Sequence, residues 1–185
     1  MPLYLAAPMS WYKAVMGHPV VTLINDARFP KQTLRQRCSF MTVEGPRVFS
    51  VPLVKSSRGL PYRQVEISYQ SHWQNELIHA LQTSYGKAPF FEYYDYRFEA
   101  IIRHKHRYLW DLNHILLEET LKCLRMDVKL EVLHAEAYIP DPPLITDEKP
   151  YYQVFADKTG FFPGMSVLDL IFNEGVNAYH VLSGM

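Results

Sequence analysis

The chain has 185 residues, with 19 basic and 19 acidic side chains and therefore no formal net charge. Hydrophobic residues make up 48% of it, which is enough for a sizeable core and excludes intrinsic disorder, collagen-like sequence and a disulfide-stabilised miniprotein. The balanced charge argues against a protein that holds nucleic acid through one large basic face. We expect a single domain over residues 1–185.

Residues 1–16 have no basic leader, and Pro8 interrupts their apolar run. No apolar run elsewhere reaches the roughly 18 residues that a membrane-spanning helix needs. Cys38 and Cys123 lie far apart in the chain, as expected of reduced thiols rather than a disulfide framework. We therefore expect a cytoplasmic protein without a membrane partner.

The first half of the chain favours strands. Two short apolar runs, residues 3–7 and 20–24, flank a helix predicted over residues 10–16, which gives a strand–helix–strand unit. Two β-rich runs follow at residues 37–43 and 47–54. They are separated by Glu44-Gly45-Pro46, a turn sequence, so a β-hairpin is expected.

Apolar spacing predicts helices in the second half. The helices expected are residues 72–85, 107–126 and 166–172 and one from 176, and the further strands are 66–69, 128–133 and 151–155. Residues 139–150 contain four prolines and are expected to be an extended connection. The whole pattern predicts an α/β fold, with a mixed sheet, the N-terminal strand–helix–strand unit, the hairpin and packed helices.

A polar cluster follows the strand predicted at 20–24. It contains four cations, Arg28, Lys31, Arg35 and Arg37. Ligands of α/β sheets collect at the carboxyl ends of strands, and these cations together with Gln32 would suit a phosphate, a carboxylate or a sugar. Asp26 could orient a cation or bind a ligand hydroxyl. The alternative is a solvated loop with local ion pairs.

Polar residues of the final third have structural and functional interpretations. Ser166 and Asp169 have the spacing of a helix cap, which accounts for both without a function. Gln153 and Asn173 lie among aromatic residues. If buried, their amides need partners, which would be backbone groups or a ligand.

Familiar catalytic motifs are absent from the sequence. Its eight histidines lack the spacing of a zinc site, and no phosphate-binding glycine loop is found, so no metal and no cofactor is expected. Cys38 beside Arg37 could be a reactive thiolate, although a small buried strand residue is the commoner case.

An ordered set of short segments resembles the WbqC-like proteins of bacteria. The segments are Lys31-Gln32 with Arg35 and Arg37, Phe49-Ser50-Val51-Pro52-Leu53, Trp73, Tyr85-Gly86-Lys87-Ala88-Pro89-Phe90-Phe91, Leu112-Asn113, Tyr152-Gln153-Val154-Phe155, and residues 162–175. The resemblance implies a single WbqC-like domain in a cytoplasmic bacterial protein linked to O-antigen or other surface-polysaccharide biosynthesis. Two features depart from the family pattern. The proline-rich stretch that ends at Pro150 occupies the place where longer relatives have an additional central segment. The Gln-Pro pair that usually follows the first strand is replaced by Ala7-Pro8.

With this resemblance, the leading hypothesis is a transferase-like enzyme acting on an activated or nucleotide-linked sugar. The expected roles are diphosphate binding by Lys31, Gln32, Arg35 and Arg37, a sugar or acceptor pocket lined by Tyr152, Gln153 and Asn173, and Asp26 as the candidate base. The alternative is a non-catalytic ligand-binding or assembly protein of the same pathway. Its partner surface would be the aromatic run 90–96, although a core-facing helix or loop is the commoner case for such a run. The expected ligand is a small phosphorylated anion, nucleic acid is disfavoured, and a homodimer is left open.

Overall fold

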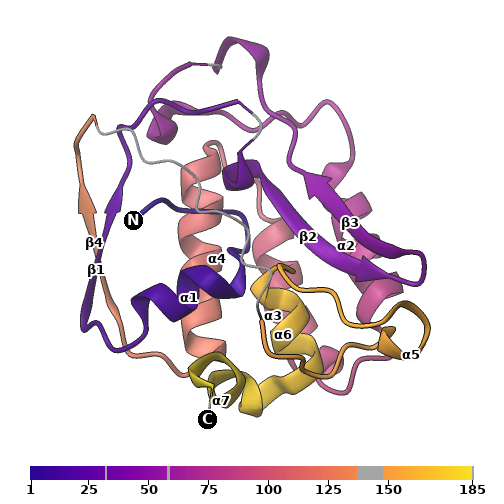
Figure 1. Ribbon diagram of the computed structural model, residues 1–185. Coiled ribbons are helices and arrows are strands. Elements are labelled where there is room, and N and C mark those ends of the chain that lie inside the picture. The colour runs from indigo at the N-terminus through magenta and orange to yellow at the C-terminus, as the bar shows by residue number, and fades with distance from the viewer. Residues whose placement is uncertain (32, 58, 137–147, 185) are drawn as a thin grey trace.

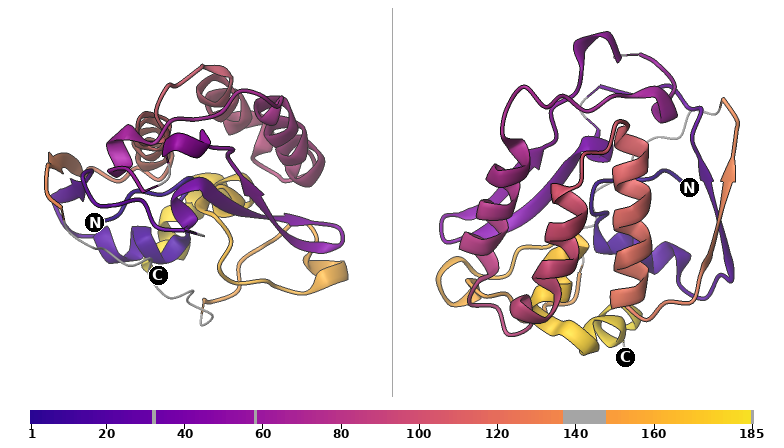
Figure 2. Two further views of the ribbon diagram at one scale, coloured as in Figure 1. Left: turned by 90° about the horizontal axis from the view of Figure 1, so that it is seen from above. Right: turned by 180° about the vertical axis from the view of Figure 1, so that it is seen from behind.

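Three consecutive helices form one layer of the molecule. The computed structural model describes residues 1–31, 33–57, 59–136 and 148–184. Helices α2 (Trp73–Tyr85), α3 (Phe91–Arg103) and α4 (Leu109–Cys123) lie side by side when the molecule is seen from behind (Figure 2). The strands and the N-terminal helix α1 (Met9–Val15) lie in front of them (Figure 1).

Helix α4 shows why the sequence predicts this layer well. Its leucine stripe, with Leu112, Leu116 and Leu121, is buried, whereas Asp111 and Glu118 are exposed. An apolar stripe at helical spacing must pack against other elements to leave water. The helices predicted at residues 72–85 and 107–126 are therefore confirmed, with ends that shift by up to three residues.

The strands form two pairs on opposite sides of the front layer (Figure 1). Strand β1 (Val20–Ile24) pairs in parallel with β4 (Lys129–Leu133), with Val20 opposite Lys129. Strands β2 (Arg37–Thr42) and β3 (Gly45–Ser50) form the antiparallel hairpin. Gly45, the first residue of β3 after the turn, has φ 112°, a conformation that side-chain-bearing residues rarely adopt. The α/β class, with a parallel pair and a hairpin, is confirmed.

Three segments expected as strands join no sheet among the residues that the structure describes. Residues 3–7 are buried but contain Ala6 at φ 47°, which breaks the extended run. Residues 66–69 make only isolated bridges, such as that between Leu53 and Ile67. Residues 151–155 lead into the short helix α5 (Ala156–Thr159) instead. Apolar content marked these segments as buried, but a strand also needs a neighbouring edge to bond to.

The C-terminal part closes the lower side of the molecule in Figure 1. It contains α6 (Val167–Glu174), a 3₁₀ turn η4 (Gly175–Asn177) and α7 (Ala178–Ser183). Other 3₁₀ turns occur earlier in the chain, at η1 (Leu34–Gln36), η2 (Lys55–Ser57) and η3 (Tyr62–Gln64). Most of the proline-rich connection expected at 139–150 lies outside the described residues. Within the described ranges, no helix has both the length and the apolar character needed to cross a membrane.

Candidate functional site

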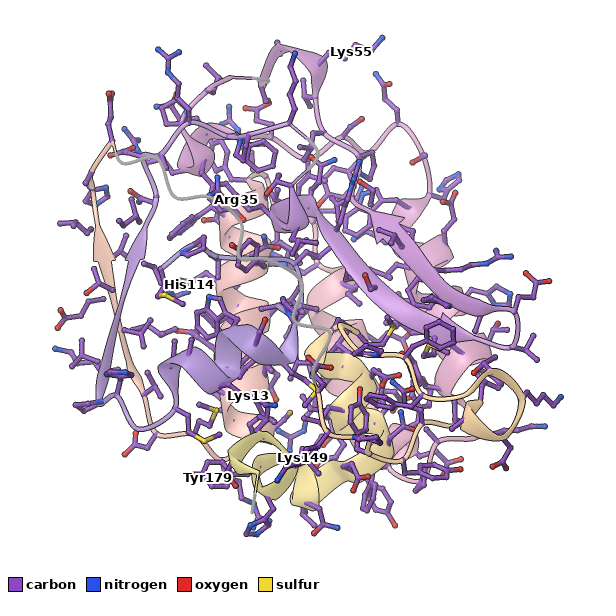
Figure 3. The ribbon with its side chains drawn as sticks, viewed as in Figure 1. Lys13, Arg35, Lys55, His114, Lys149 and Tyr179 are labelled. Atoms are coloured by element: carbon purple, nitrogen blue, oxygen red, sulfur yellow. The ribbon has the colours of Figure 1, made fainter. Side chains whose placement is uncertain are left out.

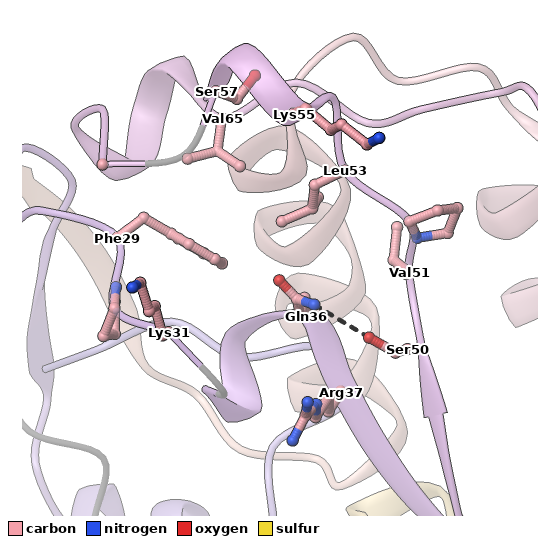
Figure 4. Close-up of a pocket in the computed structure, with 13 residues that line it drawn as sticks. Phe29, Lys31, Gln36, Arg37, Ser50, Val51, Leu53, Lys55, Ser57 and Val65 are labelled. Atoms are coloured by element: carbon pink, nitrogen blue, oxygen red, sulfur yellow. Dashed lines mark hydrogen bonds between the residues drawn. The ribbon is translucent and has the colours of Figure 1, made fainter.

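Part of the predicted cation cluster lines a pocket of about 580 Å³ (Figure 4). Lys31 comes from the loop after β1, Arg37 from the start of β2, and Lys55 from η2. We call this the basic pocket. Its other lining residues are Phe29, Pro30, Gln36, Ser50, Val51, Pro52, Leu53, Ser57, Gly59 and Val65.

The charge of this lining is of one sign. Lys31, Arg37 and Lys55 are cationic, and the described lining residues include no carboxylate that would neutralise them. Gln36 and Ser50 add polar groups, and the Gln36 amide Nε2 donates to Ser50 Oγ over 3.0 Å, which ties η1 to the end of β3. Several cations with neutral donors beside them are the side chains that bind phosphate groups.

An aromatic wall stands beside the cations. The Phe29 ring faces the basic pocket (Figure 4) and packs against the Tyr62 ring, with centroids 5.3 Å apart. Tyr62 in turn meets Trp110 of α4 edge-on at 5.2 Å. This chain of rings joins the pocket wall to the central helix. The wall is therefore held by the core and offers an apolar ring face to a ligand.

Arg35 belongs to the interior rather than to the pocket wall (Figure 3). Its side chain is only 2% exposed, and its guanidinium lies 5.6 Å from the centroid of the Tyr62 ring. Its carbonyl accepts from Asn113 Nδ2 over 2.6 Å, and Asn113 also donates to the Tyr62 hydroxyl. The structure therefore separates Arg35 from Lys31 and Arg37, the two cluster residues that line the basic pocket.

Asp26, the candidate base, is held by an ion pair with Arg63 and by a contact with the His134 ring. Its carboxylate accepts from Arg63 Nε, and its other oxygen lies 3.7 Å from His134 Nδ1. It is not among the residues that line the basic pocket. Gln32, which the sequence places in the same cluster, lies outside the described residues.

The residues expected to line a sugar pocket lie elsewhere in the fold. Gln153 is 1% exposed, and its amide donates to Phe162 O and Asp169 Oδ2, each over 2.9 Å, while its oxygen accepts from Phe162 N. Asn173 accepts from Val154 N and donates to the carbonyl of Asp169. Tyr152 is exposed. None of the three lines the basic pocket, and both amides have partners within the protein.

Asp169 is the centre of a buried polar network that sequence reasoning missed. Its carboxylate accepts from Tyr85, Tyr151 and Gln153, and the Tyr85 hydroxyl also accepts from Met41 N. Burial raises the pKa of Asp169 above its ordinary value, and the three hydrogen bonds oppose that shift. Ser166 does occupy the N-cap position of α6, but the predicted capping bond is wrong, since the Ser166 side chain makes no hydrogen bond to the first turn of the helix. The network joins α2, β2 and α6.

The two cysteines are buried and protonated. Burial raises the pKa of Cys38 to about 12 and that of Cys123 to about 11, so neither is a thiolate at neutral pH. Arg37 next to Cys38 does not activate it. In the described part of the chain, no three histidine, cysteine or acidic side chains come close enough together to hold a metal ion.

Lys55 and Ser57 are pocket residues that the sequence interpretation did not single out. They lie in η2, beyond the hairpin, and the fold brings them against the loop that follows β1. The run Lys55-Ser56-Ser57 directly after the apolar residues 51–54 was the available signal. Like the cation cluster after β1, it is a polar segment that contains a basic residue and follows an apolar run.

The fold and this site define an α/β protein with a basic pocket of small-molecule size. The chain belongs to the WbqC-like protein family, whose pattern matches residues 8–139 of the 185. All residues that line the basic pocket fall inside the matched range, whereas Tyr152, Gln153 and Asn173 lie beyond it. No curated protein and no solved structure matches the chain.

Proposed function

We propose that the protein binds a nucleotide-linked sugar in the basic pocket and acts on it as a transferase-like enzyme of bacterial surface-polysaccharide biosynthesis in the cytoplasm. The observation that carries the proposal is the lining itself: Lys31, Arg37 and Lys55 surround a space of about 580 Å³ without a described carboxylate among them. Such a lining attracts a small anion. The link to polysaccharides is part of the proposal: it rests on what the resemblance to WbqC-like proteins implies, and the chain's own residues do not supply it.

The basic pocket offers partners for the phosphates and for the base of a nucleoside diphosphate. The guanidinium of Arg37 can bind two phosphate oxygens at once, and Lys31 and Lys55 add compact charges. The ring of Phe29 offers a stacking face for a nucleobase. If a bond to the diphosphate is made or broken, the same cations would stabilise the negative charge that develops on it.

The chemical step would also need a base, and Asp26 is the candidate. It lies on the same loop as Phe29, and Arg63 and His134 fix the position of its carboxylate. A carboxylate held in this way could take a proton from the hydroxyl or amine that accepts the transferred group. The reaction class that we favour is transfer of an acyl or aminoacyl group from an activated acyl donor to a hydroxyl or amine of the sugar, with the donor's carrier departing as the leaving group.

A second candidate function is a non-catalytic binding or assembly protein of the same pathway. A specific observation favours it: the described residues that line the basic pocket include no carboxylate, imidazole or thiol, so they can hold a ligand but do not supply a base. Mass spectrometry after incubation with acyl donors separates the two candidates. A product whose formation is slowed in Asp26→Asn supports the transferase, and binding without a product supports the second candidate.

The binding itself is tested by calorimetry with nucleoside diphosphates. Arg37→Ala removes a charged donor from the lining, and we expect the affinity to fall by about 10-fold to 100-fold. Arg47→Ala is the matched control, because Arg47 is an exposed hairpin arginine outside the basic pocket that pairs with Glu44. An affinity that Arg37→Ala leaves at the level of the Arg47 variant would contradict the proposal.

A further inference from the structure

A second pocket of about 590 Å³ adjoins the basic pocket and shares Pro52, Leu53 and Lys55 with it. Its other lining residues are Val54, Ser56, Ser68, Gln70 and Ser71. We call it the serine-rich pocket. The two pockets are of similar volume, and each lies within the range that small-molecule ligands occupy.

The backbone fixes the walls of the serine-rich pocket. The segment that follows β3 runs antiparallel to the segment before α2, with Val54 N donating to Glu66 O over 2.9 Å and Ser68 N donating to Pro52 O over 2.8 Å. Leu53 and Ile67 form the bridge between these bonds. Ser68 is therefore held beside the wall that the two pockets share.

The chemistry of the two linings differs. The serine-rich pocket has the hydroxyls of Ser56, Ser68 and Ser71 and the amide of Gln70. Lys55 is its one cation, and its described lining includes no carboxylate and no aromatic ring. Uncharged groups that both donate and accept hydrogen bonds suit a ligand with many hydroxyls. The basic pocket instead gathers cations and an aromatic ring.

Lys55 stands where the two linings meet. It lies in η2, and its side chain points toward solvent at the top of the molecule in Figure 3. The ammonium group of Lys55, at the rim of both pockets, can contact a phosphate group of a ligand that extends from one pocket into the other. A ligand with an anionic group in its middle and a hydroxyl-rich end would therefore contact both pockets, and it would make more favourable contacts than a ligand that fills only one of them.

We propose that the serine-rich pocket binds the sugar of the nucleotide-linked sugar, while the basic pocket binds its nucleoside diphosphate and Lys55 contacts the phosphate nearest the sugar. This inference rests on the proposed function. It moves the sugar site away from Tyr152, Gln153 and Asn173, where the sequence led us to expect it. The amides of Gln153 and Asn173 are already bonded within the protein.

The test compares free nucleoside diphosphates with their sugar conjugates. We would measure dissociation constants by calorimetry for UDP and UDP-glucose, GDP and GDP-mannose, and dTDP and dTDP-glucose, and continue with the pair that binds most tightly. The ratio of the two constants isolates the contribution of the sugar. We expect Gln70→Ala and Ser68→Ala each to reduce this preference for the conjugate by about fivefold to tenfold, the loss of one hydrogen bond, with the free diphosphate unaffected.

Two further variants make the result specific. Gln82→Ala is the matched control, since Gln82 is exposed on α2 and lines neither of the two pockets. Arg37→Ala should weaken the diphosphate and its conjugate by a similar factor and so preserve their ratio. Thermal melting without ligand checks that each variant folds, and Gln70, which is exposed, covers the case in which Ser68→Ala does not.

The outcomes separate the two proposals. A ratio that Gln70→Ala and Ser68→Ala leave at the level of Gln82→Ala would overturn the sugar site, and so would an equal loss for the diphosphate and the conjugate. In both cases the Arg37 result still decides whether the basic pocket binds the diphosphate. If none of the six probes binds the unaltered protein, the sugar site and the proposed function both fail.

Discussion

Arg35 and Arg37 are two residues apart, yet they have different environments. Arg35 lies in η1, whose turn directs its side chain against the Tyr62 ring, and it is 2% exposed. Arg37 begins β2 and lines the basic pocket. If the segment were extended, the two side chains would share a face, as the sequence alone suggested. The 3₁₀ turn removes that relation.

This difference in environment predicts that truncating the two side chains to alanine changes the stability of the protein by different amounts. Arg35→Ala leaves a space beside Tyr62 and should lower the free energy of unfolding by about 2 kcal/mol or more, or roughly 4–8 °C in melting temperature. Arg37→Ala should change the stability by less than about 0.5 kcal/mol, because its side chain lies at the surface of a pocket. Thermal and urea unfolding of the two variants measure this. Equal loss in both would mean that Arg37 is also structural.

The burial of Arg35 could not be predicted from its neighbours in sequence. The groups that surround it, Tyr62 and Asn113, come from η3 and α4, and only the folded chain brings them together. The same holds for Asp169. Its spacing from Ser166 predicted a local cap, but Tyr85 and Tyr151 bind its carboxylate instead. Local spacing indicates local bonds, and distant partners replaced them here.

At the scale of elements, those with a self-contained pattern were predicted and those defined by a partner were not. Helix α4 repeats leucine on one face, and the hairpin has its own turn, so both are visible in the sequence. Helix α3 was left open between a surface, a helix and a loop. Its buried Phe91 and Phe98 flank the exposed Tyr93 and Tyr96, and aromatic residues on both faces hide its periodicity.

The end of α6 depends on a glycine. Gly175 has φ 53°, and a Cβ built there would lie 2.4 Å from the Phe90 ring, which precedes α3. Gly17 also has a positive φ, of 80°, but a Cβ there would meet no atom within 4 Å. Both glycines allow a backbone conformation that alanine adopts poorly. Only Gly175 also permits close packing between two elements.

This contrast predicts the order of two variants. Gly17→Ala should lower the free energy of unfolding by about 1 kcal/mol, the backbone cost alone. Gly175→Ala should add the displacement of Phe90 and lower it by about 1–3 kcal/mol more. Chemical denaturation of the two proteins tests the order. Equal losses would show that the loop before α3 gives way without cost and that Gly175 serves only the turn.

At the scale of the whole molecule, the balanced charge conceals a local excess. The 19 basic and 19 acidic residues cancel in sum, but Lys31, Arg37 and Lys55 all line one pocket. The sequence revealed Lys31 and Arg37 because they cluster along the chain. It did not reveal Lys55, which the fold brings in from a separate segment. When two distant segments form a site, clustering along the sequence can identify the residues of one segment but does not show that the other joins them.

A local excess of charge and an extended basic face differ in their response to salt and to polymer length. We predict that the affinity for a nucleoside diphosphate falls only a few-fold between 50 and 200 mM salt, because a small ligand has no condensed counterion layer to release and salt only screens its contacts with the pocket cations. A 20-base RNA or DNA should show no binding even at the lower salt, since the neutral remainder of the surface offers its phosphates no further partners. Fluorescence anisotropy with labelled oligonucleotides, run beside calorimetry of the diphosphate, measures both. Oligonucleotide binding that weakens steeply with salt would show instead that the cations form part of a nucleic-acid-binding surface. That result would contradict the proposal that the basic pocket serves a small ligand.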